Sequence, residues 1–502
     1  MVAQILSQAG IFLSDPMLIG LSVLGVIVGI IFGMLPGLSS TMALAVLLPI
    51  SFTMDPEAGI TFLIAVFSAS VYGGSLSAIL VNIPGTPGAI VTQIDGYPMA
   101  RKGQAGQAIG YATLASAFGG VFGWLILVLF APLIVQVATS FQSPDFTALI
   151  LFGLTMLAYA APGSMFKGLV GGIFGLLLAT VGLDTLTSIP RFSFGSTDMM
   201  GGIGIIPLAV GMFGVAEVLV NLEGGVKQLK AVAPVSKILD KVLPKWRELR
   251  RLVPIGIRSS IIGVIIGAIP AAGSAIAVVI AYAQEKRMAR RPERFGTGIP
   301  EGIVAPESSN NACVGGALVP MMTFGIPGDT MTAVLMGGLL IHGLRPGPGL
   351  FRDHLPFVAT VYIALIFAIV VTTLLGLAGA RLSARILSIP KPILLTSVMV
   401  LCIIGSFSVN NSIFDVWVML VFGVIGYLMR KAHFPIAPVA FGLILGPLFE
   451  ENLRRSLIVN QGDWLVFLQR PISLSLLLIS LASLFYPVFR RWLETRRQEQ
   501  EG

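Results

Sequence analysis

The sequence predicts an all-α polytopic membrane protein, built from two inverted-topology repeats that each contain a re-entrant helical hairpin and a discontinuous transmembrane helix. Composition is the first observation behind this prediction. Only 11% of the 502 residues are charged and the mean hydropathy is +0.91, whereas a soluble domain carries roughly 25% charged residues. The second observation is a pair of hydrophobic segments, broken by Gly and Pro, at matching positions of the two halves. The third is that Lys and Arg lie in loops between apolar runs, where they are orientation signals and not a nucleic-acid surface.

The first hydrophobic unit, about 17–53, is predicted to be a hairpin with both ends on the outer side of the membrane. Residues 1–100 contain no Lys or Arg, and segments with few basic flanking residues stay outside under the positive-inside rule. The chain is expected to turn at the Pro-Gly pair 36–37. A discontinuous helix follows at about 57–100 and is broken at residues 82–86, which read Asn-Ile-Pro-Gly-Thr.

The second half repeats this order with opposite flanks. Its hairpin, about 254–283, lies between two loops rich in Lys and Arg, so both of its ends are predicted to be cytoplasmic. Its discontinuous helix, about 300–342, is broken at residues 325–329, which read Gly-Ile-Pro-Gly-Asp. Two hairpins that enter from opposite faces indicate inverted repeats. The predicted divisions are a first repeat 1–222, a basic cytoplasmic linker 223–253, a second repeat 254–450, and a final helix with a cytoplasmic tail, 451–502.

The halves also match at individual positions. With one constant offset, Gly29, Gly33, Pro36 and Ser40 fall on Gly263, Gly267, Pro270 and Ser274. The Gly pair 73–74 and the break 82–86 fall on 315–316 and 325–329 with a one-residue gap. Weak but ordered similarity of this kind is typical of internal transporter repeats.

The remaining apolar runs bring the total to eleven predicted crossings plus two hairpins. These runs are about 105–138, 146–161, 168–183, 203–222, 355–380, 392–409, 414–429, 434–449 and 471–489. The exceptions to the charge rule, basic residues that fall on the outer side in this scheme, are Arg345, Arg352, Arg454 and Arg455. The two cysteines, Cys313 and Cys402, lie in apolar surroundings and predict neither a disulfide nor a metal site.

The breaks have a chemical consequence. Unwound backbone at membrane depth is tolerated only where protein buries it or where it lines an aqueous cavity. Proline removes a donor and frees a carbonyl, and glycine lets a ligand approach the backbone. Freed carbonyls and nearby hydroxyls suit Na⁺, while the positive N-terminal ends of half-helices suit a carboxylate. We therefore predict a carrier with a carboxylate site and a Na⁺ site near the tips, with Na⁺ as coupling ion, no other cofactor and no catalytic residue.

The predicted ligands come from both halves. The predicted substrate site consists of Pro36, Gly37, Ser39, Ser40, Thr86, Ser274, Asn310 and Thr330. The predicted Na⁺ ligands are Ser40, Asn82, Ser274, Thr323 and Asp329.

Other interpretations of these residues stay open. The four-residue spacing of Gly25 and Gly29 favours close helix packing. Asp329 has the residue type of a helix N-cap, although an ionisable group at membrane depth also indicates function. Glu307, beside Asn310 and Asn311, could cap a helix or lie at a cavity mouth, and we favour the structural role.

Several motifs resemble the large permease subunit of tripartite tricarboxylate transporters, the TctA family. They are Leu35-Pro36-Gly37-Leu38, Tyr72-Gly73-Gly74-Ser75 through Asn82-Ile83-Pro84-Gly85, Asp95-Gly96-Tyr97-Pro98-Met99, Pro306 through Ala312, and Gly325 through Asp329. The resemblance covers nearly the whole chain. It implies a bacterial inner-membrane importer of carboxylates such as citrate, driven by a cation gradient. It also implies two partners, a small TctB-like membrane subunit and a periplasmic TctC-like substrate-binding protein.

Combined with the charge pattern, the resemblance places the N-terminus in the periplasm and the C-terminus in the cytoplasm. Alternating access of the elevator type is expected by analogy with other hairpin-tipped inverted repeats. Two alternatives remain at this point: a stand-alone or proton-coupled organic anion permease, and an intramembrane enzyme. The sequence contains no HExxH motif and no phosphate-binding GxxxxGK[ST] motif, which disfavours the enzyme and an ATP-driven pump.

Overall fold

The computed structural model describes residues 2–160, 164–184, 186–223, 240–270, 272–387 and 389–485. These residues form helices and one pairing of two very short strands, so the all-α prediction is confirmed. Eight of the described helices are long and apolar enough to cross a membrane, as a polytopic protein requires. The chain divides into two compact units: unit 1 contains residues 1–135 and 206–427, and unit 2 contains 136–205 and 428–502.

The first half of unit 1 contains both breaks predicted there. Helix α2 ends at Met34, and Leu35 continues in an extended conformation. Helix α3 then begins under the cap of Ser39, whose hydroxyl accepts a hydrogen bond from the Met42 amide. The elements are α1 (Val2–Ser14), α2 (Pro16–Met34), α3 (Ser40–Phe52), α4 (Pro56–Val81), η1 (Pro87–Ala89), α5 (Thr92–Met99), η2 (Ala100–Gln104), in which the chain kinks at Gly103 with φ of 80°, and α6 (Ala105–Ala138). A helix interrupted by a π-helical turn follows later: α10 (Ile205–Ala209), η3 (Val210–Val215) and α11 (Ala216–Glu223).

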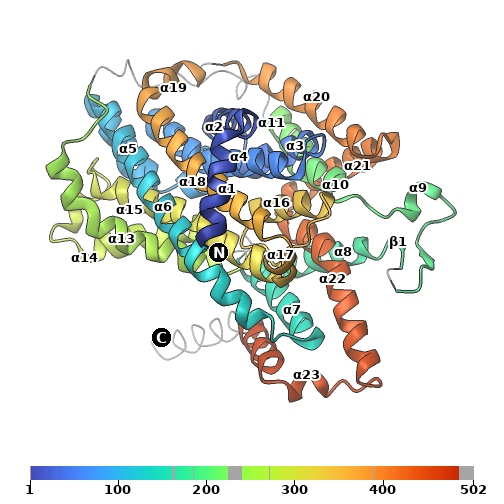
Figure 1. Cartoon of the computed structure of the whole chain (residues 1–502). Coiled ribbons are helices and arrows are strands. Elements are labelled where there is room, and N and C mark those ends of the chain that lie inside the picture. Colours follow the sequence, from blue (N-terminus) through green and yellow to red (C-terminus); the bar gives the residue numbers. More distant parts are fainter. Residues whose placement is uncertain are drawn as a thin grey trace, which may run out of the picture. The chain divides into compact units, whose positions relative to one another are not determined.

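The second half of unit 1 has the same sequence of breaks. Helix α13 ends at Ala268, two residues before Pro270, and α15 ends at Phe324, three residues before Pro327. Figure 1 shows α13, α14 and α15 grouped together. The elements are α13 (Trp246–Ala268), α14 (Gly273–Met288), η4 (Pro292–Arg294), α15 (Glu301–Phe324), α16 (Thr330–Ile341), α17 (Pro348–Asp353), α18 (Leu355–Ala378), α19 (Ala380–Ile386), α20 (Lys391–Asn410) and α21 (Ile413–Lys431).

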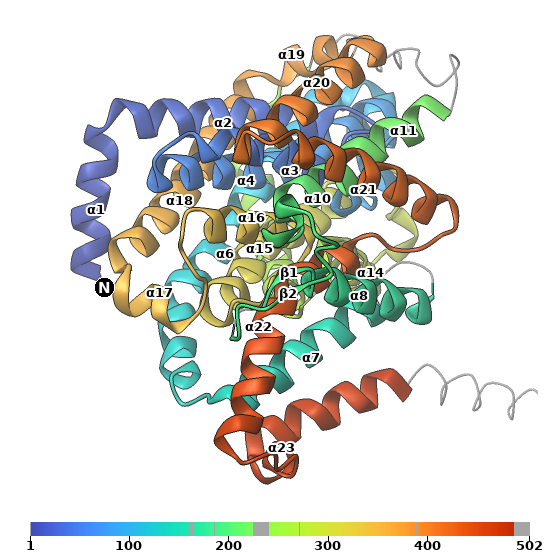
Figure 2. The same cartoon turned by 90° about the vertical axis from the view of Figure 1, so that its right-hand side faces the viewer.

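The two halves pack their broken segments through corresponding glycines. Helix α2 lies against α4 (Figure 2), and a Cβ on Gly33 would be 2.1 Å from the Ser70 carbonyl oxygen. Helix α13 lies against α15, and a Cβ on Gly267 would be 2.6 Å from the Cys313 carbonyl oxygen. Glycine is needed at such positions because the backbones approach too closely for a side chain.

The contacts also refine how the halves correspond. A Cβ on Gly73 would meet the Ile30 carbonyl oxygen at 2.5 Å, and one on Gly316 would meet the Val264 carbonyl oxygen at 2.6 Å. Gly73 therefore corresponds to Gly316, and the one-residue gap that the sequence comparison contained is not needed. The C-caps of α4 and α15, Asn82 and Gly325, are both left-handed, with φ of 57° and 70°.

The hairpin arms are unequal in length. Helices α2 and α13 have 19 and 23 residues, whereas α3 and α14 have 13 and 16. At about 1.5 Å per residue, only the first arm of each hairpin has the length of a full crossing. Re-entrance and the count of eleven crossings stay predictions. Helix α1 was not predicted, and α13 begins inside the predicted linker. Residues 224–239 of that linker and the tail after 485 lie outside the described residues.

Loops that were assigned to a common face contact each other in unit 1. On the predicted cytoplasmic face, Lys102 Nζ donates to the Thr297 carbonyl oxygen at 2.6 Å, and Asp240 accepts from the amide of Gly106 at 2.8 Å. On the predicted outer face, Gln8 Nε2 donates to Thr360 Oγ1 at 3.0 Å. These contacts are consistent with the predicted grouping of loops, while the choice of cytoplasmic face stays a prediction.

Unit 2 is built around α22, which packs against α7 and α8. A Cβ on Gly175 would be 2.2 Å from the Val439 carbonyl oxygen, so α8 and α22 touch backbone to backbone. The elements are α7 (Ser143–Ala160), α8 (Met165–Ala179), β1 (Gly182–Leu183), β2 (Pro190–Arg191), α9 (Thr197–Met200), α22 (Ala437–Val459), α23 (Val466–Gln469) and the apolar helix Pro471–Phe485. Strands β1 and β2 pair antiparallel, with Gly182 opposite Arg191.

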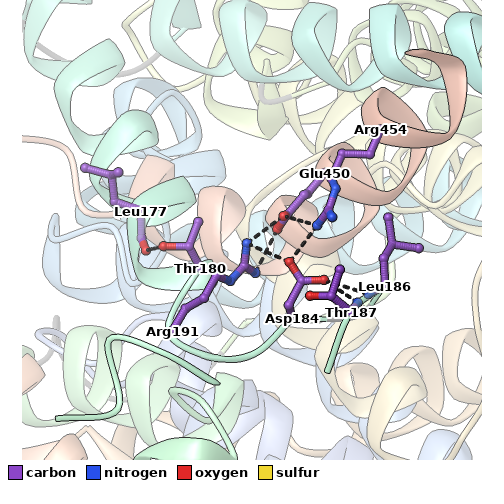
Figure 3. Close-up of polar contacts among 8 residues, drawn as sticks. All are labelled: Leu177, Thr180, Asp184, Leu186, Thr187, Arg191, Glu450 and Arg454. Carbon is purple, nitrogen blue, oxygen red and sulfur yellow. Dashed lines mark hydrogen bonds and ion pairs between the residues drawn. The ribbon is translucent and has the colours of Figure 1, made fainter. Parts of the chain in front are cut away.

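An ion-pair cluster joins this strand pair to α22 (Figure 3). Arg191 forms a two-pronged contact with Glu450, at 2.6 and 3.0 Å. Arg454, one of the exceptions to the charge rule, donates to Asp184 at 2.6 Å. The Asp184 carboxylate also accepts hydrogen bonds from the backbone amides of Leu186 and Thr187. The positive charge of Arg454 is therefore neutralised by nearby carboxylates. For this reason Arg454 is weak evidence for which side of the membrane its loop lies on.

Candidate functional site

The two hairpin tips lie close to the breaks of the two discontinuous helices, residues 82–86 and 325–329, inside unit 1. Thr41, at the start of α3, has its hydroxyl 3.0 Å from the hydroxyl of Thr330, at the start of α16. At the other tip, a Cβ on Gly88 would lie 2.6 Å from Ser274 Oγ. A Cβ on Gly273 would lie 4.0 Å from the Cβ of Asp329. The first tip therefore touches the break of the opposite half, and the second tip touches the segment just after the first-half break as well as the break of its own half.

Asn310 lies at this junction with its amide unpaired. It is fully buried in α15, and a Cβ on Gly88 would come within 2.1 Å of its Oδ1. Among the described residues it is the one side chain whose amide nitrogen and oxygen are both buried without a hydrogen-bond partner in the protein. Such unpaired groups cost about 1–3 kcal/mol each. A polar ligand bound here would remove that penalty.

Two other predicted substrate ligands share this property. The hydroxyl oxygens of Ser40 and Thr86 are buried and unpaired as well. Unpaired buried hydroxyls also occur elsewhere in the described chain, for example at Ser22 and Ser259. The junction is distinguished because several unpaired groups lie on the broken segments themselves.

The other predicted substrate residues are placed as follows. Pro36 is half-buried, and Gly37 is exposed with φ of +94°. The Gly37 carbonyl oxygen accepts a hydrogen bond from Asn221 Nδ2 at 3.1 Å, which anchors the first tip to α11. Ser39 serves as the cap of α3, and Ser274 is half-buried at the second tip.

Three of the predicted Na⁺ ligands have the following surroundings in this structure. Asn82 is exposed at the end of α4. The Thr323 hydroxyl donates to Val319, in its own helix, at 2.7 Å. Asp329 caps α16 and exchanges hydrogen bonds with Thr332 in a capping box. The capping interpretation of Asp329 therefore describes this conformation, and its role as an ion ligand stays a prediction.

Glu307 is a polar residue that the predicted site omitted. It is fully buried in α15, and its carboxylate accepts hydrogen bonds from Ser75 at 2.6 Å and Ser116 at 2.8 Å. Thr92 donates a third, short hydrogen bond to the same carboxylate. The three hydroxyls come from three helices, α4, α5 and α6. Glu307 and Ser75 both belong to motifs on which the family resemblance was based. Those motifs were therefore the sequence feature from which this cluster could have been found.

Asp95 has a structural task close to this region. Its buried carboxylate accepts hydrogen bonds from the backbone amides of Gly296, Gly298 and Ile299, and from the Tyr282 hydroxyl at 2.8 Å. It therefore fixes the loop that leads into α15. A Cβ on Gly302 would be 2.0 Å from this carboxylate, so the first turn of α15 packs directly on it.

A separate basic hollow of about 760 Å³ lies at the far end of the second hairpin. Arg258 forms a two-pronged contact with the buried Glu285 there, at 2.8 and 2.6 Å. The other arginines that line the hollow are Arg251, Arg290, Arg291 and Arg294. None of the predicted site residues lines it. These arginines come from the basic segments before and after the hairpin, and the cytoplasmic assignment of its ends was based on those segments.

Comparison with known proteins agrees with this architecture. The family described as "Tripartite tricarboxylate transporter TctA family" matches residues 19–441, which include all four breaks. The chain belongs to the TctA family. TctA membership makes it a subunit of a tripartite tricarboxylate transporter and implies partners of the TctB and TctC type.

Two relatives of this TctA chain come from Agrobacterium vitis. One is described as an uncharacterized 52.8 kDa protein in the TAR-I ttuC' 3' region. It is 38% identical over 458 residues, covering 91% of this chain and 90% of the relative. The other, an uncharacterized protein in the TAR-II ttuC' 3' region, is 34% identical over 215 residues, covering 43% of this chain and 89% of the relative.

Proposed function

We propose that this protein is the large transmembrane subunit of a secondary, Na⁺-coupled carboxylate importer in the bacterial inner membrane. A periplasmic substrate-binding protein delivers a citrate-like tricarboxylate, and a small membrane subunit completes the complex. The observation that carries the proposal is the buried, unpaired Asn310 amide, which lies against Gly88 at the place where the second hairpin tip meets the first half. Broken helices that meet inside a bundle are the usual construction of a carrier's substrate site.

The substrate carboxylates bind neutral donors in this proposal. The Asn310 amide and the hydroxyls of Ser40 and Thr86 are buried groups that lack a protein partner. The N-terminal ends of α3 and α14 add the partial positive charge of the helix dipole. Together these groups recognise an anion without a guanidinium clamp.

The division of the chain supports an elevator-type cycle. All four breaks belong to unit 1, whereas α22 and the Arg191–Glu450 cluster belong to unit 2. A carrier of this type needs its substrate groups on one body that moves as a whole. We assign that part to the broken segments of unit 1.

Reconstituted transport tests the proposal. The chain, its small subunit and the binding protein are placed in liposomes, and uptake of labelled citrate is measured under an imposed Na⁺ or H⁺ gradient. We expect uptake that requires the binding protein and follows the Na⁺ gradient. Absence of uptake under every gradient would contradict secondary transport, and equal uptake without the binding protein would favour the stand-alone permease.

A further inference from the structure

The Glu307 carboxylate has an unusual environment. Its described polar partners are the hydroxyls of Ser75, Thr92 and Ser116, and all three side chains are themselves buried. No Lys, Arg or His of the described chain forms an ion pair with it. The site thus contains one acidic group, three hydroxyls and no compensating protein cation.

A positive charge beside the Glu307 carboxylate would stabilise it in this buried position. Taking a carboxylate out of water costs several kcal/mol even after the surroundings relax, and breaking a buried pair leaves that cost uncompensated. Three hydroxyl donors recover part of the cost, because hydrogen bonds to a charged acceptor are worth about 1.5–3 kcal/mol each. A bound cation would supply the charge that the protein lacks.

The atoms present suit a small hard cation. A hydroxyl that donates to the carboxylate keeps its oxygen lone pairs for a cation. The carboxylate and the three hydroxyls therefore offer an all-oxygen set, which hard cations prefer over nitrogen or sulfur ligands. One carboxylate matches a monovalent charge, whereas Ca²⁺ and Mg²⁺ sites draw on several anionic oxygens or on phosphates.

We propose that Glu307, Ser75, Thr92 and Ser116 form the Na⁺ site of this transporter. The inference rests on the proposed function as a cation-coupled importer. It assigns the coupling ion to a carboxylate on α15, one turn before Asn310, in place of the residues at the helix ends. Na⁺ binds between α4, α5, α6 and α15 and holds these four helices together.

The position of this site explains how the ion is coupled to the substrate. Glu307 and Asn310 are three residues apart and so lie on one face of α15. Thr92 begins α5, which directly follows the segment whose Gly88 touches Asn310. A Na⁺ ion that joins Thr92 to Glu307 therefore fixes the Gly88 segment against the Asn310 amide. Binding of the ion therefore stabilises the arrangement in which the substrate site is assembled.

Binding of ²²Na⁺ by the purified chain in detergent tests the site without any partner or substrate. We expect saturable binding that weakens at least about tenfold in Glu307→Gln, the range found when metal-site groups are altered. Ser116→Ala should weaken binding to a smaller extent. Ser70→Ala is the control, because Ser70 is buried on α4, the helix that carries Ser75, but its hydroxyl donates to Phe67 of its own helix.

Size-exclusion profile and melting temperature show whether each variant is folded, and Ser116→Ala carries the test if Glu307→Gln does not fold. Wild-type Na⁺ affinity in folded Glu307→Gln would overturn the site, as would the absence of saturable Na⁺ binding by the wild type. Citrate uptake in the complete system separates the two proposals. Uptake driven by an H⁺ gradient alone would contradict the Na⁺ site and support the importer function. Na⁺ binding that depends on Glu307, without any citrate uptake, would support the Na⁺ site and contradict the importer function.

Discussion

At Asn310, protein stability and ligand binding favour different side chains. Its amide is fully buried, yet neither its nitrogen nor its oxygen has a protein partner. Stability alone would favour an apolar side chain of similar size, because an unpaired buried polar group is a net cost. The position therefore has the character of a functional site, where a group is kept for its ligand.

This argument predicts an unusual effect of Asn310→Ala. Citrate uptake should fall at least about tenfold, since one lost hydrogen bond to a charged ligand is worth about 1.5–3 kcal/mol. The melting temperature of the ligand-free protein should stay the same or rise, because an unpaired polar group has been removed. Asn452→Ala is the control: the Asn452 side-chain amide donates to the Leu448 carbonyl oxygen of its own helix, and its loss should leave uptake unchanged. A clear loss of stability in Asn310→Ala would contradict the assignment.

A second prediction concerns the charge on Asp184 outside the membrane segments. The backbone amide of Thr187, opposed in part by desolvation and aided by Leu186 and Arg454, holds the pKa of Asp184 well below its usual range. A carboxylate with a lowered folded-state pKa stabilises the protein above its unfolded-state pKa, and this stabilisation is lost as the pH falls through the folded-state value.

Asp184→Asn should therefore lower the melting temperature by a few degrees at neutral pH. The difference from wild type should persist down to about pH 4, the ordinary pKa of an aspartate, and narrow only below it. Melting curves at several pH values measure this. A difference that disappears between pH 7 and pH 5 would show that the Asp184 charge is not what stabilises the cluster.

At the scale of helices, proline alone does not decide where a helix ends. Pro306 and Pro320 lie inside α15, and the helix continues through both until Gly325 takes a left-handed conformation. The breaks could be predicted because each contains Pro, which removes a donor, followed within three residues by Gly, which permits the turn. The Glu307 cluster could not be predicted in this way. Its hydroxyls come from α4, α5 and α6, and their meeting depends on packing that no local pattern records.

Close packing of α2 on α4 gives the prediction at this scale. Gly33→Ala should destabilise the protein by about 1–3 kcal/mol, because the new Cβ would meet the Ser70 carbonyl oxygen at 2.1 Å. Gly20→Ala is the matched control on the same helix, where a Cβ would find nothing within 4 Å. That change should be neutral or stabilising, since alanine is favoured over glycine inside helices. Equal melting temperatures for the two variants would contradict the packing argument.

At the scale of the whole molecule, the sequence was informative about membrane insertion and the order of the breaks. It did not indicate the division into two units, because unit 2 combines residues 136–205 with residues 428–502, two stretches that are more than 200 residues apart in the chain. The contact of α22 with α7 and α8 depends on small residues such as Gly175 and Gly442, whose partners are far apart in sequence. The loop contacts of unit 1 divide its loops into two groups, one on each predicted face. The side of the membrane on which each group lies can be measured.

Cysteine labelling in intact cells provides that measurement. The native Cys313 and Cys402 are buried and should give little background with a membrane-impermeant maleimide. Single cysteines replace exposed residues of unit 1, two on each predicted side: Ser14 and Arg352 outside, Arg101 and Arg290 inside. We expect Ser14→Cys and Arg352→Cys to react before permeabilisation, and Arg101→Cys and Arg290→Cys to react only after it, because basic loops stay cytoplasmic.

Labelling of Arg101→Cys but not Arg290→Cys in intact cells would contradict a common face for the two loops. Labelling of both would reverse the predicted orientation and leave the grouping of the loops intact.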